Sequence, residues 1–353
     1  MLFEWMYPNV FNILQFSVER WTSQNEITTP IMRLLSELAT NRHQRHKFEM
    51  SSCSAILLFR ETAKIISTYG NLLLALPKVP ESRVYKERYK NMGIVFHTLN
   101  NAFIGTYVPC GVFRLYGDTC LQDVLNTFVK FFMEIPEDDF HGYTKIVQNY
   151  YNLLENVAQE NMPYITNLSI GVICAILRSI KSGITSLNVV VLTSACSVLD
   201  ILLGYLYKRI TRGAAAAPKV GQEQEGDNII QAIEQNPHIL ADLLQTLVSI
   251  MMFGDAKCQW SLSRPMLGLI LIQQDYFEKV KVELTRQQPF EKQPYFQAAF
   301  SQLMQGVENN MSVKNKDTFT QNLSKFRRDV GDILKGKEIA GSVSVGGNMN
   351  DMS

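Results

Sequence analysis

Three clusters of basic residues are the side chains in this sequence whose type and spacing best suit an interaction, and the chemistry is binding rather than catalysis. Lysine and arginine can form charge-assisted hydrogen bonds with acidic groups on a partner protein. Solvated helix ends and faces carry the same residue types, so both interpretations stay open. The clusters are Arg42, Arg45 and Lys47; Arg83, Lys86, Arg88 and Lys90; and Lys325, Arg327 and Arg328.

A histidine pair could be imagined as a metal site. His43 and His46 have a spacing compatible with zinc, and Cys53 follows seven residues later. The arginine and lysine residues of the first basic cluster surround this pair and would oppose a bound cation. We therefore interpret the segment as a solvated basic turn and expect no metal site.

Three consecutive carboxylates, Glu137, Asp138 and Asp139, could carry acid–base chemistry, but their position favours another role. They follow Pro136, where acidic residues stabilise the first turn of a helix. The sequence has no phosphate-binding glycine loop and no nucleophile elbow. We therefore expect a protein that is not an enzyme and that uses no cofactor.

The composition excludes several other classes. The 353 residues are 46% hydrophobic and 19% charged, which is not the composition of a disordered chain. A formal net charge of +1 argues against nucleic acid as a direct partner. Six scattered cysteines without a CxxC pair, and the lack of a secretory signal, indicate reduced thiols.

One stretch, residues 187–207, is apolar over the length of about 20 residues that a membrane span needs. It is interrupted by Asn188, Thr193, Ser194, Ser197 and Asp200. An aspartate at mid-membrane depth costs roughly 3 kcal/mol on insertion scales. We therefore predict no membrane insertion and interpret this stretch as a buried helix.

The elements that would position all these side chains are helices, and the clearest pair spans residues 163–212. The sequence predicts two helices joined by a break at Lys181-Ser182-Gly183, with apolar residues at steps of three and four on one face of each. The stripe of the first helix is Ile165, Leu168, Val172, Ile176 and Ile180. The stripe of the second is Leu187, Val191, Ala195, Val198, Leu202 and Leu206.

Similar helical patterns fill the rest of the chain, and no alternating strand pattern persists. We therefore predict an all-α fold, an α-solenoid of HEAT-type antiparallel helix pairs over residues 1–335. Within this array we expect a flexible linker at 213–226, and after it a disordered tail at 336–353. The further helices are expected at 7–21, from Thr29-Pro30 to about 40, at 54–76, 86–103, 120–135, 137–157, 228–235, 237–253, 265–286, 293–310 and 316–335.

The segment 105–118 is predicted to be a connector, because it is rich in glycine and contains Pro109. It still carries Phe113, Leu115 and Tyr116. We expect these large side chains to pin the connector to the core.

Four runs resemble the C-terminal part of the exportin-7 family, which are karyopherin-β proteins of the importin-β superfamily. The resemblance extends over about residues 2–335. The runs are ILLFRET at 56–62, GVFRLYGD at 111–118, QWSLSRPMLGLIL at 259–271 and FTQNLSKFRR at 319–328.

The resemblance implies a nuclear export receptor that shuttles between nucleus and cytoplasm through the nuclear pore. Its implied partners are protein cargo, nucleoporins and Ran carrying GTP. In the family, the main Ran-contacting repeats lie toward the N-terminus, before the part that this chain resembles. The alternative is a generic HEAT-repeat scaffold or adaptor that is not linked to Ran.

Overall fold

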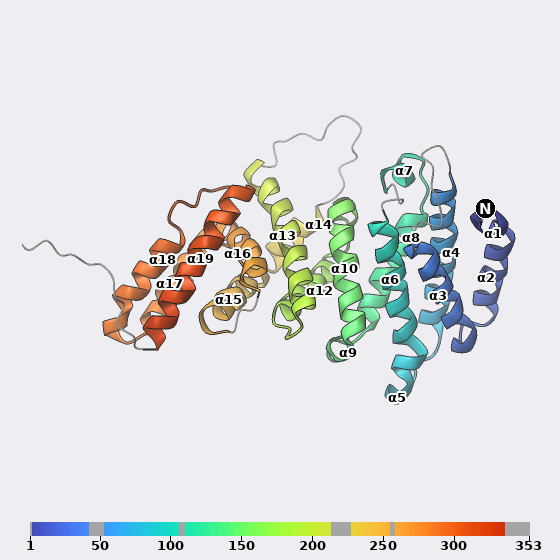
Figure 1. Ribbon diagram of the computed structural model, residues 1–353, viewed down its shortest axis with the longest axis horizontal. Coiled ribbons are helices and arrows are strands. Elements are labelled where there is room, and N and C mark those ends of the chain that lie inside the picture. The colour runs from blue at the N-terminus through green and yellow to red at the C-terminus, as the bar shows by residue number, and fades with distance from the viewer. Residues whose placement is uncertain (1, 42–52, 106–109, 213–226, 255–257, 336–353) are drawn as a thin grey trace, which may run out of the picture. The chain divides into compact units, whose positions relative to one another are not determined.

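The computed structural model describes residues 2–41, 53–105, 110–212, 227–254 and 258–335, which form helices joined by turns (Figure 1). These described residues contain no strand, so the all-α prediction is confirmed. The chain divides into two compact units, residues 1–239 (unit 1) and 240–353 (unit 2), and each is described by itself. The predicted linker at 213–226 and tail at 336–353 lie outside the described residues and stay predictions.

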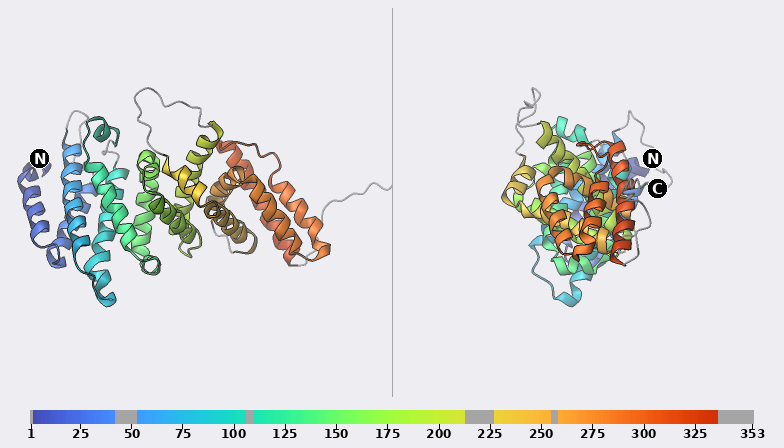
Figure 2. Two further views of the ribbon diagram at one scale, coloured as in Figure 1. Left: turned by 180° about the vertical axis from the view of Figure 1, so that it is seen from behind. Right: turned by 90° about the vertical axis from the view of Figure 1, so that its left-hand side faces the viewer.

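Unit 1 is built from helices in two layers, and it follows the blue to yellow part of the chain in Figures 1 and 2. Its principal helices are α2 (Asn9–Arg20), α3 (Asn25–Thr40), α4 (Ser54–Ala75), α6 (Lys90–Ile104), α8 (Cys120–Glu134), α10 (Thr144–Glu160), α12 (Ile170–Ile184), α13 (Val189–Arg212) and α14 (Asn228–Gln235). Its short elements are α1 (Leu2–Met6), α5 (Glu81–Val84), a π-helical turn (Tyr85–Tyr89), α7 (Cys110–Leu115), α9 (Glu137–Gly142) and α11 (Met162–Thr166).

Each layer is a row of helices in which successive members touch. One row is α2, α4, α8, α12 and α14, and the other is α3, α6, α10 and α13. Consecutive helices of the chain, such as α12 and α13, join the two rows. This arrangement is that of an α-solenoid, in which each helix pair buries its apolar face against its neighbours.

Polar side chains fix the register along the second row. The Thr29 hydroxyl donates to Asn91 Oδ1 at 2.8 Å, which joins α3 to α6. Asn156 Nδ2 donates to Asn100 Oδ1 at 2.8 Å and joins α10 to α6. Buried polar groups that find such partners specify one packing arrangement, because any shift would leave them unpaired.

The central helix pair exists, but the predicted break at 181–183 is wrong. Gly183 lies inside α12, where a Cβ would come within 2.8 Å of the Ala195 Cβ, so the glycine allows α12 and α13 to approach closely. The turn lies at 185–188 instead, and Leu187 in it is 102% exposed. The other five members of the predicted second stripe are buried.

Of the described helices, one stretch is long and apolar enough to cross a membrane, namely Val189–Thr211 in α13, and its most apolar window of 18 residues has a mean hydropathy of 2.1. Half of its most apolar window is buried inside the protein. The Ser194 and Ser197 hydroxyls donate to Asn152 and Glu155 of α10. Core helices pass the same length and composition test, and these contacts are those of a core helix.

Two prolines that the sequence suggested as helix starts lie inside helices. Pro30 falls in α3, and Pro265 falls in α16. Proline removes one backbone hydrogen bond within a helix. Each of these helices begins several residues earlier than expected and packs firmly enough to tolerate that loss.

Unit 2 contains the helices in the gold to red part of Figure 1. α19 packs against both α16 and α18, and α17 packs against α18. The helix expected at 265–286 is two helices that meet at Gln273, and the helix expected at 293–310 ends at Leu303. The elements are α15 (His238–Phe253), α16 (Gln259–Ile272), α17 (Gln274–Arg286), a 3-10 turn (Phe290–Lys292), α18 (Gln293–Leu303) and α19 (Val313–Leu334).

Candidate protein-binding surfaces

The four family-like runs meet in pairs, although each pair is far apart in the sequence. In unit 1, the run on α4 meets the run on α7 through the Phe59 and Phe113 rings, whose centroids are 5.4 Å apart. In unit 2, the run on α16 meets the run on α19, where the Ser263 and Thr320 hydroxyl oxygens are 2.7 Å apart. We call the first contact region, formed by α4, α7 and α8, the unit 1 junction, and the second, formed by α16 and α19, the unit 2 junction.

A tight turn after α7 holds the unit 1 junction together. Gly117 has a φ of +65°, and the Asp118 and Gly117 N–H groups donate to the Phe113 and Arg114 carbonyls at 2.9 and 3.2 Å. This is the Schellman pattern, which favours glycine in the left-handed position. Asp118 Oδ1 accepts the Cys120 N–H at 3.0 Å, so its other oxygen points to Arg60 Nε at 3.1 Å.

The side chains before this turn are not where the sequence placed them. Phe113 is buried as expected, but Leu115 and Tyr116 are 78% and 79% exposed. The expectation that all three pin the connector to the core is therefore wrong for two of them. A short helix can direct only some of its side chains inward, so Leu115 at the end of α7 and Tyr116 directly after it face solvent.

A polar groove of about 620 Å³ lies between α4 and α8 next to this turn. Arg60 pairs with Asp118 at one end, and Lys130 Nζ donates to Asn71 Oδ1 at 3.1 Å at the other. Arg60 and Asn71 follow one another along the chain in the same order as their partners Asp118 and Lys130, so α4 and α8 run parallel. Gly70 lets α4 approach α8, because a Cβ there would clash with Thr127.

Cys120 lines the same groove but is a poor nucleophile. Burial, together with the nearby Asp118 carboxylate, raises the pKa of the Cys120 thiol to about 12. Near neutral pH the group is therefore a protonated thiol, whereas thiolates are the reactive form. The groove is suited to hydrogen bonding and charge recognition.

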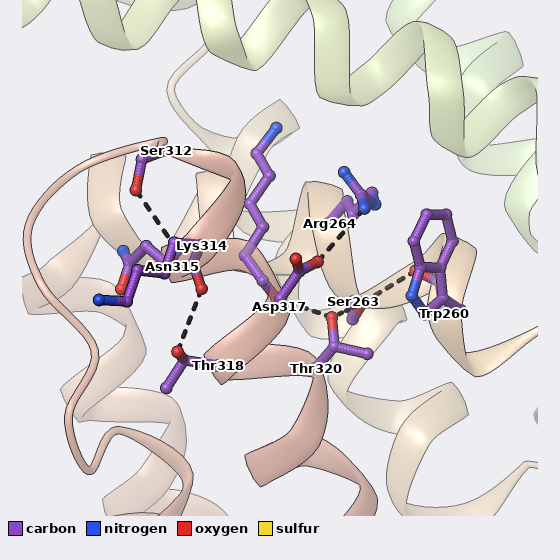
Figure 3. A network of polar contacts seen from close by, with 10 residues as sticks. Trp260, Ser263, Arg264, Ser312, Lys314, Asn315, Asp317, Thr318 and Thr320 are labelled. Carbon is purple, nitrogen blue, oxygen red and sulfur yellow. Dashed lines mark hydrogen bonds and ion pairs between the residues drawn. The ribbon is translucent and has the colours of Figure 1, made fainter.

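The unit 2 junction is packed more closely and is shown in Figure 3. Ser263 is fully buried, and its hydroxyl also donates to the Trp260 carbonyl at 2.8 Å. The Arg264 guanidinium lies 3.9 Å from the centre of the Trp260 ring and reaches Asp317 at 3.5 Å. Trp260 remains 58% exposed, so the outer edge of this junction presents an aromatic ring next to a cation.

The first predicted basic cluster, Arg42, Arg45 and Lys47, lies outside the described residues, as do His43 and His46. In the part of the chain that is described, no group of three metal-ligating side chains comes together. Of the three carboxylates suggested for a helix start, Asp139 accepts the Tyr89 hydroxyl at 2.8 Å. Burial and this bond raise the pKa of Tyr89, which marks a structural contact.

The second cluster is divided between the surface and the interior. Arg83 and Lys86 are exposed, and Arg83 forms an ion pair with Glu87 one turn away at 3.2 Å. Lys90 is half-buried at the start of α6. These three residues remain accessible to a partner.

Arg88 is not on the surface, which corrects its place among the binding candidates. It is 4% exposed, and its Nη2 donates to the Leu76 and Pro77 carbonyls at 2.7 and 2.8 Å. It therefore caps the end of α4, and Nη1 lies 3.6 Å from Glu134 at the end of α8. The wide π-helical turn Tyr85–Tyr89 breaks the α-helical period here, so helical spacing alone gives the wrong orientation for Arg88.

The third cluster lies on α19. Lys325 and Arg328 are exposed, whereas Arg327 is half-buried and donates to the Gly254 carbonyl at 3.1 Å. A main-chain carbonyl at the end of α15 is a structural partner. Lys325 and Arg328 are thus the members of this cluster most open to contact with another protein.

Known proteins are similar to this chain over its whole length. No family model matches the chain. Exportin-7-B of Xenopus laevis is 43% identical over 354 residues, which cover 100% of this chain and 32% of that protein. The chain matches a C-terminal segment of proteins of the exportin-7 family. The resemblance inferred from the four runs is therefore confirmed.

Two further relatives match the chain over a similar extent. Ran-binding protein 17 of Mus musculus is 43% identical over 337 residues, covering 95% of this chain and 31% of that protein. Ran-binding protein 16 of Drosophila melanogaster is 38% identical over 339 residues, with 95% and 31% covered. The chain spans about a third of the length of the curated relatives that it matches.

Proposed function

We propose that this chain is the protein-binding C-terminal part of a nuclear export receptor whose cargo binding is controlled by Ran carrying GTP. The observation that carries the proposal is the 43% identity to an exportin over the whole chain. The relatives named as Ran-binding proteins support the link to Ran. The segment acts by presenting docking surface, and it has no catalytic role in the proposal.

The two rows of unit 1 suit this role. Helices that contact only their neighbours can flex as an array while presenting a long continuous surface. Exposed lysine and arginine side chains can steer and bind acidic partners. The accessible candidates for cargo or nucleoporin contact are Arg83, Lys86 and Lys90 in unit 1, and Lys325 and Arg328 in unit 2.

In this proposal the segment binds cargo, and the family's N-terminal repeats make the main contact with Ran. The receptor then moves between nucleus and cytoplasm through the nuclear pore. Binding of cargo and of Ran carrying GTP would be coupled, so that each strengthens the other by the same factor.

Deleting the segment tests the proposal. Full-length exportin-7-B of Xenopus laevis, with and without the part matched by this chain, is incubated with cargo and with Ran carrying GTP or GDP. We expect the deletion to weaken the GTP-dependent cargo complex by at least about tenfold, equivalent to about 1.4 kcal/mol. Undiminished complexes would refute the proposal.

The same experiment separates the proposal from the scaffold alternative. A HEAT-repeat scaffold or adaptor that is not linked to Ran would bind its partners equally with either nucleotide. Partners that need this segment but ignore the nucleotide on Ran would therefore favour the scaffold function over export.

A further inference from the structure

We propose that the polar groove between α4 and α8 docks an extended segment of a partner protein that carries an acidic and a basic side chain in close succession. The inference rests on the proposed protein-binding function and names the surface and the chemistry of the partner. Its first support is the arrangement of opposite charges on the two walls.

Three steps follow one another along the groove between the two parallel helices, and a side-chain contact bridges the first and the third. At the first step Arg60 pairs with Asp118, and at the third step Lys130 donates to Asn71. These closed steps lie at the ends of the groove, and the close packing of Gly70 against Thr127 sets the separation of α4 and α8. The groove is therefore preorganised, which reduces the entropy lost when a segment binds.

The middle step is open. Lys64 lies one turn after Arg60, and Asp123 lies about one turn after Asp118, and both line the groove. Within the described residues Lys64 has no ion-pair or hydrogen-bond partner, and the Asp123 carboxylate accepts only the Thr119 hydroxyl, at 2.8 Å. A partner carboxylate would meet Lys64, and a neighbouring partner cation would meet Asp123.

The groove lining favours a polypeptide over an apolar small molecule. The groove lining includes the hydroxyl group of Ser67 and the amide groups of Asn71 and Asn126. Small-molecule pockets are lined mainly by apolar side chains, whereas this groove is lined by charged, hydroxyl and amide groups.

Two large exposed side chains lie close in the sequence to Asp118, which lines the groove. Leu115 ends α7 and Tyr116 follows it, three and two residues before Asp118 in the fixed Schellman turn. Tyrosine is enriched among residues that dominate binding energy. A segment in the groove with an apolar side chain a few residues from its charged pair would contact both.

Labelled peptides of about ten residues test the inference on the full chain by fluorescence anisotropy. One contains Leu and a central Glu-Arg pair, and three controls carry Glu-Gln, Gln-Arg or Gln-Gln at that place. We expect the Glu-Arg peptide to bind at least about tenfold more tightly than any control, and Lys64→Glu to remove that advantage. Lys279→Glu, an exposed lysine on α17, is the matched control and should change nothing.

Exchanging the charges on the two walls of the groove gives a second, independent measurement. The double variant Lys64→Glu with Asp123→Lys should prefer a peptide with the reversed order, Arg-Glu, over the original. Because Lys64 has no partner in the described structure, Lys64→Glu should unfold at the same temperature as the parent chain, whereas Asp123→Lys also removes the bond from the Thr119 hydroxyl at the start of α8. Restored binding of the reversed peptide is an outcome that a general loss of folding could not produce.

Three results would overturn the inference. One is equal binding of the Glu-Arg and Gln-Gln peptides, and another is no effect of Lys64→Glu. Displacement of the peptide by free glutamate and arginine at the same concentration would show a small-molecule site instead. These measurements use the chain without Ran, so their failure is distinguishable from that of the export function, which the deletion tests.

Discussion

Polar side chains line an open groove at the unit 1 junction, whereas they fill the helix interface at the unit 2 junction. Between α4 and α8, the long side chains of Arg60 and Lys130 bridge from wall to wall. Between α16 and α19, the short hydroxyls of Ser263 and Thr320 meet directly at 2.7 Å, and Ser263 is fully buried. The length of the bridging side chains thus distinguishes an interface that is open to a partner from one that is complete.

The largest expected effect tests how closely the helices approach below the groove. Gly70→Ala should destabilise the chain by about 1–3 kcal/mol, because its Cβ would overlap the Thr127 methyl group and force α4 and α8 apart. Urea denaturation followed by circular dichroism measures the change. A neutral result would mean that the helices can separate freely, and that the groove width is not fixed.

The unit 2 junction offers the matched control for this substitution. Gly331 on α19 has open space where a Cβ would be. Gly331→Ala should therefore stabilise the chain by about 0.5–1 kcal/mol, since alanine favours a helix over glycine. Two alanine substitutions with opposite signs would sharpen the contrast between the junctions.

An intermediate effect is expected from alkaline pH. Burial raises the pKa of Tyr69 on α4 to about 12, while α16 and α19 contain no tyrosine. The unfolded chain releases this proton near pH 10, so stability is complete below pH 10 and falls as pH rises through 12. At pH 11 the loss from Tyr69 should be about 1 kcal/mol.

Tyr69→Phe provides the check on that prediction. The variant cannot ionise at this position, so its stability should fall less between pH 9 and pH 11 than that of the parent chain. Urea titrations at the two pH values, each followed by tryptophan fluorescence, measure the difference. Identical pH profiles would show that the buried phenol does not contribute to the alkaline loss.

The smallest expected effects come from the bridging groups themselves. Asp118→Asn should cost at most about 1 kcal/mol, because Arg60 is largely exposed and water screens the pair. Ser263→Ala should cost about 0.5–1.5 kcal/mol, because it removes a buried hydrogen bond. Repeating both measurements at high salt should reduce only the first cost. A stability cost of Ser263→Ala that falls at high salt would contradict the contrast between the two junctions.

Prolines and helical periodicity predicted much of the fold because they act locally. The sequence placed α4 and α8 within about a residue of their ends, since Pro77 and Pro136 follow them and disfavour helix continuation. Five of six residues in the predicted stripe of α13 are buried. In each case the signal lay within a few residues of the feature.

The errors arose where distant contacts decide the outcome. Gly183 suggested a break, but it packs against α10 and α13 through Tyr151 and Ala195. Pro265 suggested a helix start, yet α16 runs through it because α19 supports that helix. The groove was not predicted at all, because Lys64 and Asp123 come together only through the register of α4 against α8.

The π-helical turn Tyr85–Tyr89 has a further consequence for how this protein tolerates length changes. The turn accommodates one residue more than a regular helix would at the same place. Removing a single residue there would leave α5 and α6 as one ordinary helix, but would swing the Arg88 guanidinium out from beneath the end of α4. The carbonyls of Leu76 and Pro77 would then lose their donor. The deletion would therefore loosen the end of α4, the helix that forms one wall of the groove.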